Sequence, residues 1–181
     1  ALVFAWTETA QGLDLTSPAL VSTPPGSSAL AVAPSVLTPG ASYTFRLTVT
    51  DPNKPDGQSG GSAYATVSVQ VNSPPAGGTC TATPWAGEAF TQVFLLQCKG
   101  WSDSNEPLQY KFDYTAAGTT LRALRGRTST SSFAARLSVG AVTLHLTIYD
   151  SLGVTTVRTL GVSVMPSAQL LADAEGFVAD A

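Results

Sequence analysis

Two stretches of eight residues share one pattern, and this repeat constrains the fold more than any other feature of the sequence. TFRLTVTD occupies residues 44–51 and TLHLTIYD occupies residues 143–150. Both read threonine, apolar, basic, leucine, threonine, apolar, any residue, aspartate. Apolar residues at every second position are typical of a β-strand with one buried face. The separation of roughly one hundred residues matches one immunoglobulin-sized β-sandwich, so the pattern predicts a repeated module.

The segments that flank the two copies repeat in the same order. LVFAWT (residues 2–7) precedes the first copy as LQYKFDYT (residues 108–115) precedes the second. ATVSVQV (residues 65–71) follows the first copy as TLGVSV (residues 159–164) follows the second. We expect the strand at residues 43–51 to form an antiparallel hairpin with the strand at residues 64–72, across a long polar loop. The 16 glycines and 12 prolines favour many short strands joined by turns over helices.

These segments predict an all-β fold of two tandem antiparallel sandwiches of the immunoglobulin or fibronectin type III kind, the first of them incomplete. The expected division is a partial module at residues 1–75, a second module at residues 76–165, and a tail, linker or short helix at residues 166–181. SPPAGG at residues 73–78 is the best linker candidate. LVFAWT corresponds to a mid-module strand, so we expect the early strands of the first module to lie upstream or to be donated by another chain.

The charge of the chain argues against one class of partner. Its net charge is −3 and only 12% of its residues are charged. Nucleic-acid binding would require a basic stripe, so no nucleic-acid partner is expected. No apolar run approaches the roughly 18–20 residues of a membrane span. Because the sequence does not begin with methionine, we expect a processed product or a piece of a longer protein.

The chain has two cysteines, Cys80 and Cys98. They are either two buried thiols or a disulfide, and the residues alone leave both readings open, with the disulfide favoured. A bridge across this short loop would stabilise the fold by about 3 kcal/mol in the chain-entropy model. A disulfide would also place the chain in an oxidising, extracellular compartment.

The stretch NSPPAGGTCTATPWAGEAFTQVFLLQCKGWSDSNEPLQYKFDY (residues 72–114) resembles the receptor-for-egg-jelly region of polycystins and sperm egg-jelly receptors. The upstream stretch LTPGASYTFRLTVTD (residues 37–51) is also similar to the strand pair that precedes this region, so the resemblance covers residues 36–165. The residues that match the family pattern are Pro74, Pro75, Gly77, Gly78, Cys80, Pro84, Gly87, Ala89, Phe94, Cys98, Gly100, Trp101, Asp103, Pro107, Leu108, Tyr110, Phe112 and Tyr114.

The resemblance implies an extracellular segment of a larger, membrane-anchored and channel-associated protein. It implies modules of the fibronectin type III or polycystic-kidney-disease kind, and it implies that Cys80 and Cys98 are paired. In that family the region lies ahead of an autoproteolytic domain and a channel-like membrane part. The sequence shows neither, so cleavage and channel activity are not carried over to this chain.

His145 is the single histidine, and Asp150 follows it five residues later, an arrangement that raises the question of hydrolase chemistry. A catalytic histidine needs a nucleophile and an orienting carboxylate within hydrogen-bond reach, and no G-x-S-x-G context is present. His145 falls on the polar face of its strand, where the first copy has Arg46, an expected exposed residue. We therefore expect His145 to be structural, and we expect no catalytic residue, cofactor or metal site.

Four residues are candidates for partner contacts: Trp85 and the three arginines of LRALRGR, namely Arg122, Arg125 and Arg127. The arginines could meet an acidic glycan or protein, or they could lie on a solvated edge strand. Trp85 could stack on a sugar or pack internally. Trp101 is expected to pack against the disulfide, and Trp6 to be a core residue of its strand. DSNE at residues 103–106 favours a turn over a calcium site.

The function predicted from these features is non-catalytic. We expect an extracellular segment of a polycystin-like cell-surface protein, acting in adhesion, spacing or force transmission, with other extracellular proteins or glycans as partners. The bias toward Ala, Thr, Gly and Pro is typical of a GC-rich genome such as that of a green alga, and with the resemblance it favours the plasma or ciliary membrane. The alternatives are a carbohydrate-binding or other accessory module of a secreted enzyme, and a subunit of an extracellular filament.

Overall fold

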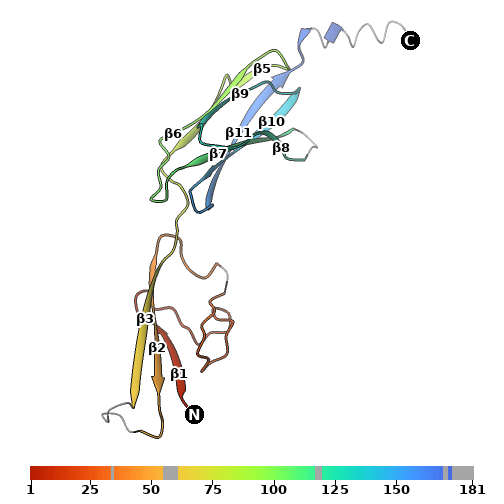
Figure 1. The fold of residues 1–181 in the computed structure, drawn as a ribbon. Helices are drawn as coiled ribbons and strands as arrows, with labels where there is room; N and C mark the ends of the chain where they lie inside the picture. Colours follow the sequence, from red (N-terminus) through yellow and green to blue (C-terminus); the bar gives the residue numbers. More distant parts are fainter. Residues whose placement is uncertain (34, 55–60, 117–119, 169–170, 173–181) are drawn as a thin grey trace, which may run out of the picture. The chain divides into compact units, whose positions relative to one another are not determined.

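The computed structural model describes residues 1–33, 35–54, 61–116, 120–168 and 171–172 (Figure 1). The strands in these residues form sheets that are antiparallel apart from one short pair, which confirms the predicted all-β fold. The chain divides into two compact units, unit 1 (Ala1–Ser73) and unit 2 (Pro74–Ala181). Of the segment predicted as tail, linker or short helix, Ala168 and residues 171–172 have helical backbone, while residues 169–170 and 173–181 lie outside the described part.

Unit 1 contains one antiparallel sheet in the order β1-β2-β3. Its strands are β1 (Val3–Glu8), β2 (Ser42–Thr50) and β3 (Ser62–Gln70). The predicted hairpin between the second and third strands is confirmed, with Phe45 opposite Val67. Residues 9–41 connect β1 to β2 and contain one isolated bridge, between Val21 and Val32. A surface pocket of about 190 Å³ lies between this segment and β1, lined in part by Trp6 and Val21.

Unit 2 is a β-sandwich. One sheet has the order β5-β11-β10-β7-β8 and the other has the order β4-β6-β9. All pairings are antiparallel except that of β5 with β11, which is parallel. The strands are β4 (Thr79–Thr83), β5 (Ala86–Glu88), β6 (Phe94–Lys99), β7 (Gln109–Ala116), β8 (Arg122–Thr128), β9 (Ser132–Ala135), β10 (Gly140–Tyr149) and β11 (Thr155–Met165).

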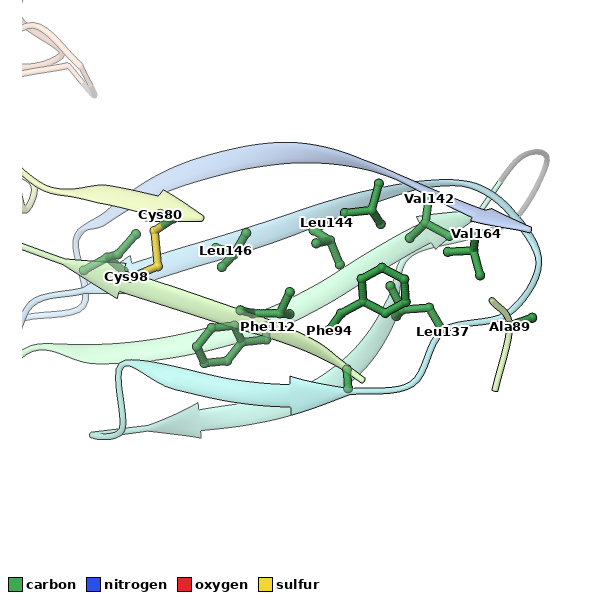
Figure 2. Packing of buried hydrophobic residues seen from close by; sticks show 14 of the residues in the cluster. Cys80, Ala89, Phe94, Cys98, Phe112, Leu137, Val142, Leu144, Leu146 and Val164 are labelled. Carbon is green, nitrogen blue, oxygen red and sulfur yellow. A yellow bond between two sulfur atoms is a disulfide. The ribbon is translucent and has the colours of Figure 1, made fainter. Parts of the chain in front are cut away.

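The core of unit 2 lies between its two sheets, where side chains from both inner faces meet (Figure 2). Phe94 and Leu96 come from β6, and Phe112 comes from β7 in the opposite sheet. Leu144 and Leu146 of β10 are 0% and 1% exposed. The strict alternation of apolar and polar residues along β10 places every second side chain in this core, as the period of two requires.

A disulfide joins Cys80 of β4 to Cys98 of β6, two residues that lie directly opposite each other in the sheet. Trp101 belongs to the same buried cluster as both cysteines, in agreement with its expected place beside the bridge. Gly78 makes room for the indole, because a Cβ on this glycine would lie 2.3 Å from Cγ of Trp101. The second glycine of the SPPAGG stretch is therefore required by packing and not by flexibility.

Residues from Pro75 onward in the SPPAGG stretch pack within unit 2, although this stretch was the best linker candidate. Pro75 is buried, and its carbonyl accepts a hydrogen bond from Oγ1 of Thr156 at 2.6 Å. The N–H and carbonyl of Ala76 bond to Ser102, both at 3.0 Å. These contacts satisfy the backbone of the motif inside the unit.

The sequence repeat is a structural repeat with the same strand register. Leu47 of β2 lies opposite Trp6 of β1, and its counterpart Leu146 of β10 lies opposite Phe112 of β7. β2 is flanked by β1 and β3, as β10 is flanked by β7 and β11. The sheet of unit 1 therefore corresponds strand by strand to β7-β10-β11 of unit 2.

Both copies of the repeat end at an aspartate that opens a turn. The carboxylate of Asp51 accepts the N–H of Asn53 at 3.0 Å. The carboxylate of Asp150 accepts the N–H of Val154 at 2.8 Å, and Asp150 is fully buried. Aspartate favours such positions because its side chain bonds to backbone groups a few residues ahead.

Candidate interaction surfaces

His145 lies on the polar face of β10, as predicted from the alternation. It is half-buried, and its Nε2 is 3.2 Å from Oγ1 of Thr115 on β7. Its cross-strand neighbour Asp113 instead forms an ion pair with Lys111 at 2.9 Å, and this hydrogen bond raises the pKa of the Lys111 amine. Asp150 lies at the end of the same strand, about 16 Å away along an extended chain. His145 and Asp150 are thus not brought together.

Arg46, the counterpart of His145, is not the fully exposed residue that the repeat suggested. Its side chain is half-buried, and its Cζ lies 3.8 Å from the centroid of the Tyr64 ring on β3. The planar guanidinium is attracted to the aromatic face, which holds it against the sheet. The contact depends on Tyr64, an aromatic residue on the adjacent strand, so the pattern of β2 alone could not reveal it.

The three arginines lie on β8, the edge strand of the five-stranded sheet, and all three are exposed. Arg127 is engaged within the unit, because its guanidinium lies 4.3 Å from the Tyr149 ring centroid and its Nη2 donates to the carbonyl of Asp150 at 3.1 Å. Arg122 and Arg125 are exposed on the same edge strand. Positive charge on an edge strand discourages pairing with another sheet and attracts acidic groups.

Trp85 lies between β4 and β5 and is 74% exposed, so the packing alternative for this residue is not what the structure shows. Its carbonyl accepts the N–H of Ser163 at 3.1 Å, which fixes its backbone against β11. Phe90, just beyond β5, is 58% exposed and has a positive φ of 60°. The backbone N–H of Ala89 donates to the carbonyl of Met165, whose side chain is also exposed. We call Trp85, Phe90 and Met165 the β5-edge surface.

The β5-edge surface and the arginines of β8 are separate sites. β5 and β8 form opposite edges of the same sheet, with β11, β10 and β7 between them. Phe90 was not found from the sequence, because a phenylalanine between alanine and threonine carries no signal of exposure. An exposed aromatic held on an ordered backbone is suited to stacking on a flat ligand.

The DSNE stretch forms a turn, as expected from its composition. The carboxylate of Asp103 accepts the N–H of Asn105 at 2.7 Å, and the Asn105 carbonyl accepts the N–H of Ser151 at 2.9 Å. Within the described ranges, no group of three or more His, Cys, Asp or Glu residues is placed to hold a metal ion. Among these same residues, no helix is long and apolar enough to cross a bilayer.

Glu8, at the end of β1, organises the loop that follows, a role that the sequence did not reveal. Its two carboxylate oxygens accept backbone N–H groups of Ala10, Gln11 and Leu13, and also that of Thr44 on β2 at 2.9 Å. Desolvation by burial raises the pKa of Glu8, but the four backbone hydrogen bonds outweigh it and lower the pKa to about 2.

Comparison with known protein families gives a match over nearly the whole chain. The REJ domain family matches residues 2–176, which include all the strands of both units. No curated protein is similar enough to the chain to match it.

Proposed function

The chain belongs to the REJ domain family, the receptor-for-egg-jelly region of polycystin-type proteins, and from this premise we propose a specific role. The role is that of a non-catalytic extracellular segment of a polycystin-like surface protein, on the plasma or ciliary membrane, which transmits force and spaces adhesive parts. Three features support it: the family match, the disulfide between Cys80 and Cys98, and a sandwich whose last strand, β11, is paired in parallel with the early strand β5.

The parallel pair of β5 and β11 is the observation that carries the mechanical part of the proposal. Ala86, Gly87 and Glu88 pair in register with Ser163, Val164 and Met165. Hydrogen bonds at 3.1 Å (Ser163 N–H to Trp85 carbonyl) and 2.8 Å (Ala89 N–H to Met165 carbonyl) flank this pair. When force acts at the start of one strand and at the end of its parallel neighbour, the hydrogen bonds between them are loaded together in shear and resist extension.

A pulling experiment on single molecules tests this role. Handles at residues 85 and 166, just before β5 and just after β11, load these two strands against each other in shear. Handles at residues 139 and 166, at the open end of the β10-β11 hairpin, peel β11 from β10 one bond at a time. We expect unit 2 to unfold at a clearly higher force with the first pair of handles. Equal or lower force in that direction would remove the mechanical role.

The extracellular setting is tested by the state of the cysteines in cells. Protein recovered from its native cells under alkylating conditions should carry no label on Cys80 or Cys98 until it is reduced. An antibody against the chain should also label intact, unpermeabilised cells, including the cilium. Labelled thiols in freshly recovered protein would contradict an extracellular location.

Glycan binding is the second candidate function, favoured by the exposed aromatic residues of the β5-edge surface. Stacking of a sugar on Trp85 or Phe90 would not require any movement of the backbone. A glycan array probed with the wild-type chain and with Trp85→Ala distinguishes this function. A glycan bound by wild type and lost in the variant supports it, and binding that persists in the variant places the site elsewhere.

A further inference from the structure

We propose that the apolar face of β3 in unit 1 is the docking face for a two-stranded antiparallel β-ribbon, linked covalently on the N-terminal side of β1 and equivalent to β4 and β6 of unit 2. We call this face, formed by Ala65, Val67 and Val69, the open face. In this reading unit 1 is a sandwich whose second layer comes from polypeptide beyond the residues described.

The open face has a counterpart in unit 2 with the same register. Val69 of β3 lies opposite Tyr43 of β2, and Val162 of β11 lies opposite Val142 of β10. Directly opposed residues in an antiparallel pair project to the same side of the sheet. The two valines therefore occupy equivalent places on equivalent sheets.

These equivalent valines differ in burial. Val162 is 4% exposed, whereas Val69 is 38% exposed and Val67 is 51% exposed. Leu160, the counterpart of Val67, is partly buried and packs against the core of unit 2. The residue types are alike, but β11 has β5 beside it whereas β3 is an edge strand. Tyr43 and Phe45, on the same face of β2, are 4% and 5% exposed, so the missing cover lies over β3 and not over the whole sheet.

The order of strands in unit 2 identifies the missing layer. There β4 lies beside β11, and both β4 and β6 precede β7 in the chain, while β9 lies between β7 and β10. In unit 1, residues 9–41 take the place between β1 and β2 and lie against β1, where Phe4, Trp6 and Leu15 line the pocket. What is uncovered is β3, the part that β4 covers in unit 2. Because β6 leads directly into β7, an equivalent ribbon would lead directly into β1.

The chemistry of the occupant follows from the same comparison. A ribbon over the open face needs apolar residues at alternate positions, as β6 provides with Phe94, Leu96 and Cys98. It would pack face to face at the roughly 10 Å separation of stacked sheets and would not extend the hydrogen-bonded edge of β3. Burial of the two exposed valines is the driving force.

A grafted chain tests the proposal. Residues 74–107, which carry β4, β5 and β6, are placed ahead of Leu2, so that Pro107 leads into LVFAWT as it leads into LQYKFDYT in unit 2. A soluble paramagnetic probe then reports the exposure of methyl groups by NMR. We expect the Val67 and Val69 methyls to become at least ~10-fold less sensitive to the probe than in the ungrafted chain. The methyl of Thr66, on the opposite face of the same strand, is the internal control and should not change.

A second graft tests whether mismatched side chains alone prevent the ribbon from packing on the open face. It also carries Trp6→Phe, Phe45→Leu and Val67→Leu, which give the sheet of unit 1 the residues found at the counterpart positions. Unchanged exposure of Val69 in both grafts overturns the proposal. Sedimentation of the ungrafted chain tests whether a second copy covers the open face instead. A dimer whose Val69 methyls become protected as concentration rises would assign the open face to a second copy, and this result would also overturn the proposal.

Discussion

Strands β2 and β10 carry the same eight-residue pattern, and each lies between two antiparallel neighbours, yet their apolar side chains are buried to different extents. Leu144, Leu146 and Ile148 of β10 are 0–1% exposed. Of their counterparts on β2, Phe45 is 5% exposed, whereas Leu47 and Val49 are only half-buried. The pattern of a strand determines which side chains share a face. Whether that face becomes a core depends on a second layer, which unit 2 has in β4-β6-β9 and the described part of unit 1 has only in residues 9–41.

The largest expected difference between the two units concerns the matched leucines. Leu146→Ala should destabilise unit 2 by about 2–5 kcal/mol, because it leaves a cavity in a closed core. Leu47→Ala should cost unit 1 clearly less, because the side chain is already partly in solvent. Denaturant unfolding followed separately in each unit by NMR measures both effects. Equal losses would mean that unit 1 is as well packed as unit 2.

The disulfide gives the next largest effect and should act on one unit alone. Replacing both Cys80 and Cys98 by alanine should destabilise unit 2 by about 3 kcal/mol, since the unfolded chain is no longer cross-linked. Unit 1 contains no cysteine, so its unfolding should be unchanged. Thermal unfolding with and without reductant provides the same comparison in the wild-type chain. A loss of stability in unit 1 on reduction would show that the units are coupled.

The two turn aspartates should differ in how much each stabilises its unit, with an effect of intermediate size. Asp150→Ala should cost unit 2 about 1–3 kcal/mol, because it removes a fully buried carboxylate that accepts the N–H of Val154. Asp51→Ala should cost no more than about 1 kcal/mol, since its turn is open to solvent and water replaces the carboxylate. Chemical denaturation of the two single variants checks the order, which the account requires to be Asp150 above Asp51.

Acid should weaken unit 1 through Glu8. The pKa of Glu8 is lowered from 4.5 to about 2 in the folded state, so its stabilising contribution is complete above pH 4.5 and is lost as the pH falls toward 2. Glu8→Gln should flatten this part of the stability curve of unit 1, and it should leave unit 2, whose counterpart residue is Tyr114, unaffected. Unfolding midpoints measured between pH 2 and 6 give the dependence of unit 1 stability on pH. The same dependence in the variant would mean that Glu8 is not its cause.

The smallest expected effect is that of the histidine. His145→Ala should change the stability of unit 2 by about 0.5–1 kcal/mol, because it removes one hydrogen bond to Thr115 on a half-buried face. Thermal unfolding of the variant is the measurement. A loss of several kcal/mol would mean that the side chain is part of the core.

Much of the sheet structure could be predicted from the sequence, because alternation along 43–51 and 143–150 reports directly which side chains share a face. The resemblance supplied the pairing of Cys80 with Cys98, which spacing alone left open. Apolar residues in the segment 9–41 follow no regular period, so its packing against β1 could not be predicted from the sequence. The contacts of Glu8 are to backbone N–H groups, which any sequence provides. The exposure of Trp85 depends on neighbours far away in the chain, and no local pattern encodes it.

Units 1 and 2 share one strand register and differ in the layer that covers the sheet. Native-state hydrogen exchange of the matched central strands tests this most directly, because both strands have hydrogen-bonded neighbours on both sides. We predict that the amides of Leu144, Leu146 and Ile148 are protected on the order of 100-fold more than those of Phe45, Leu47 and Val49. Equal protection of the two strands would contradict the account.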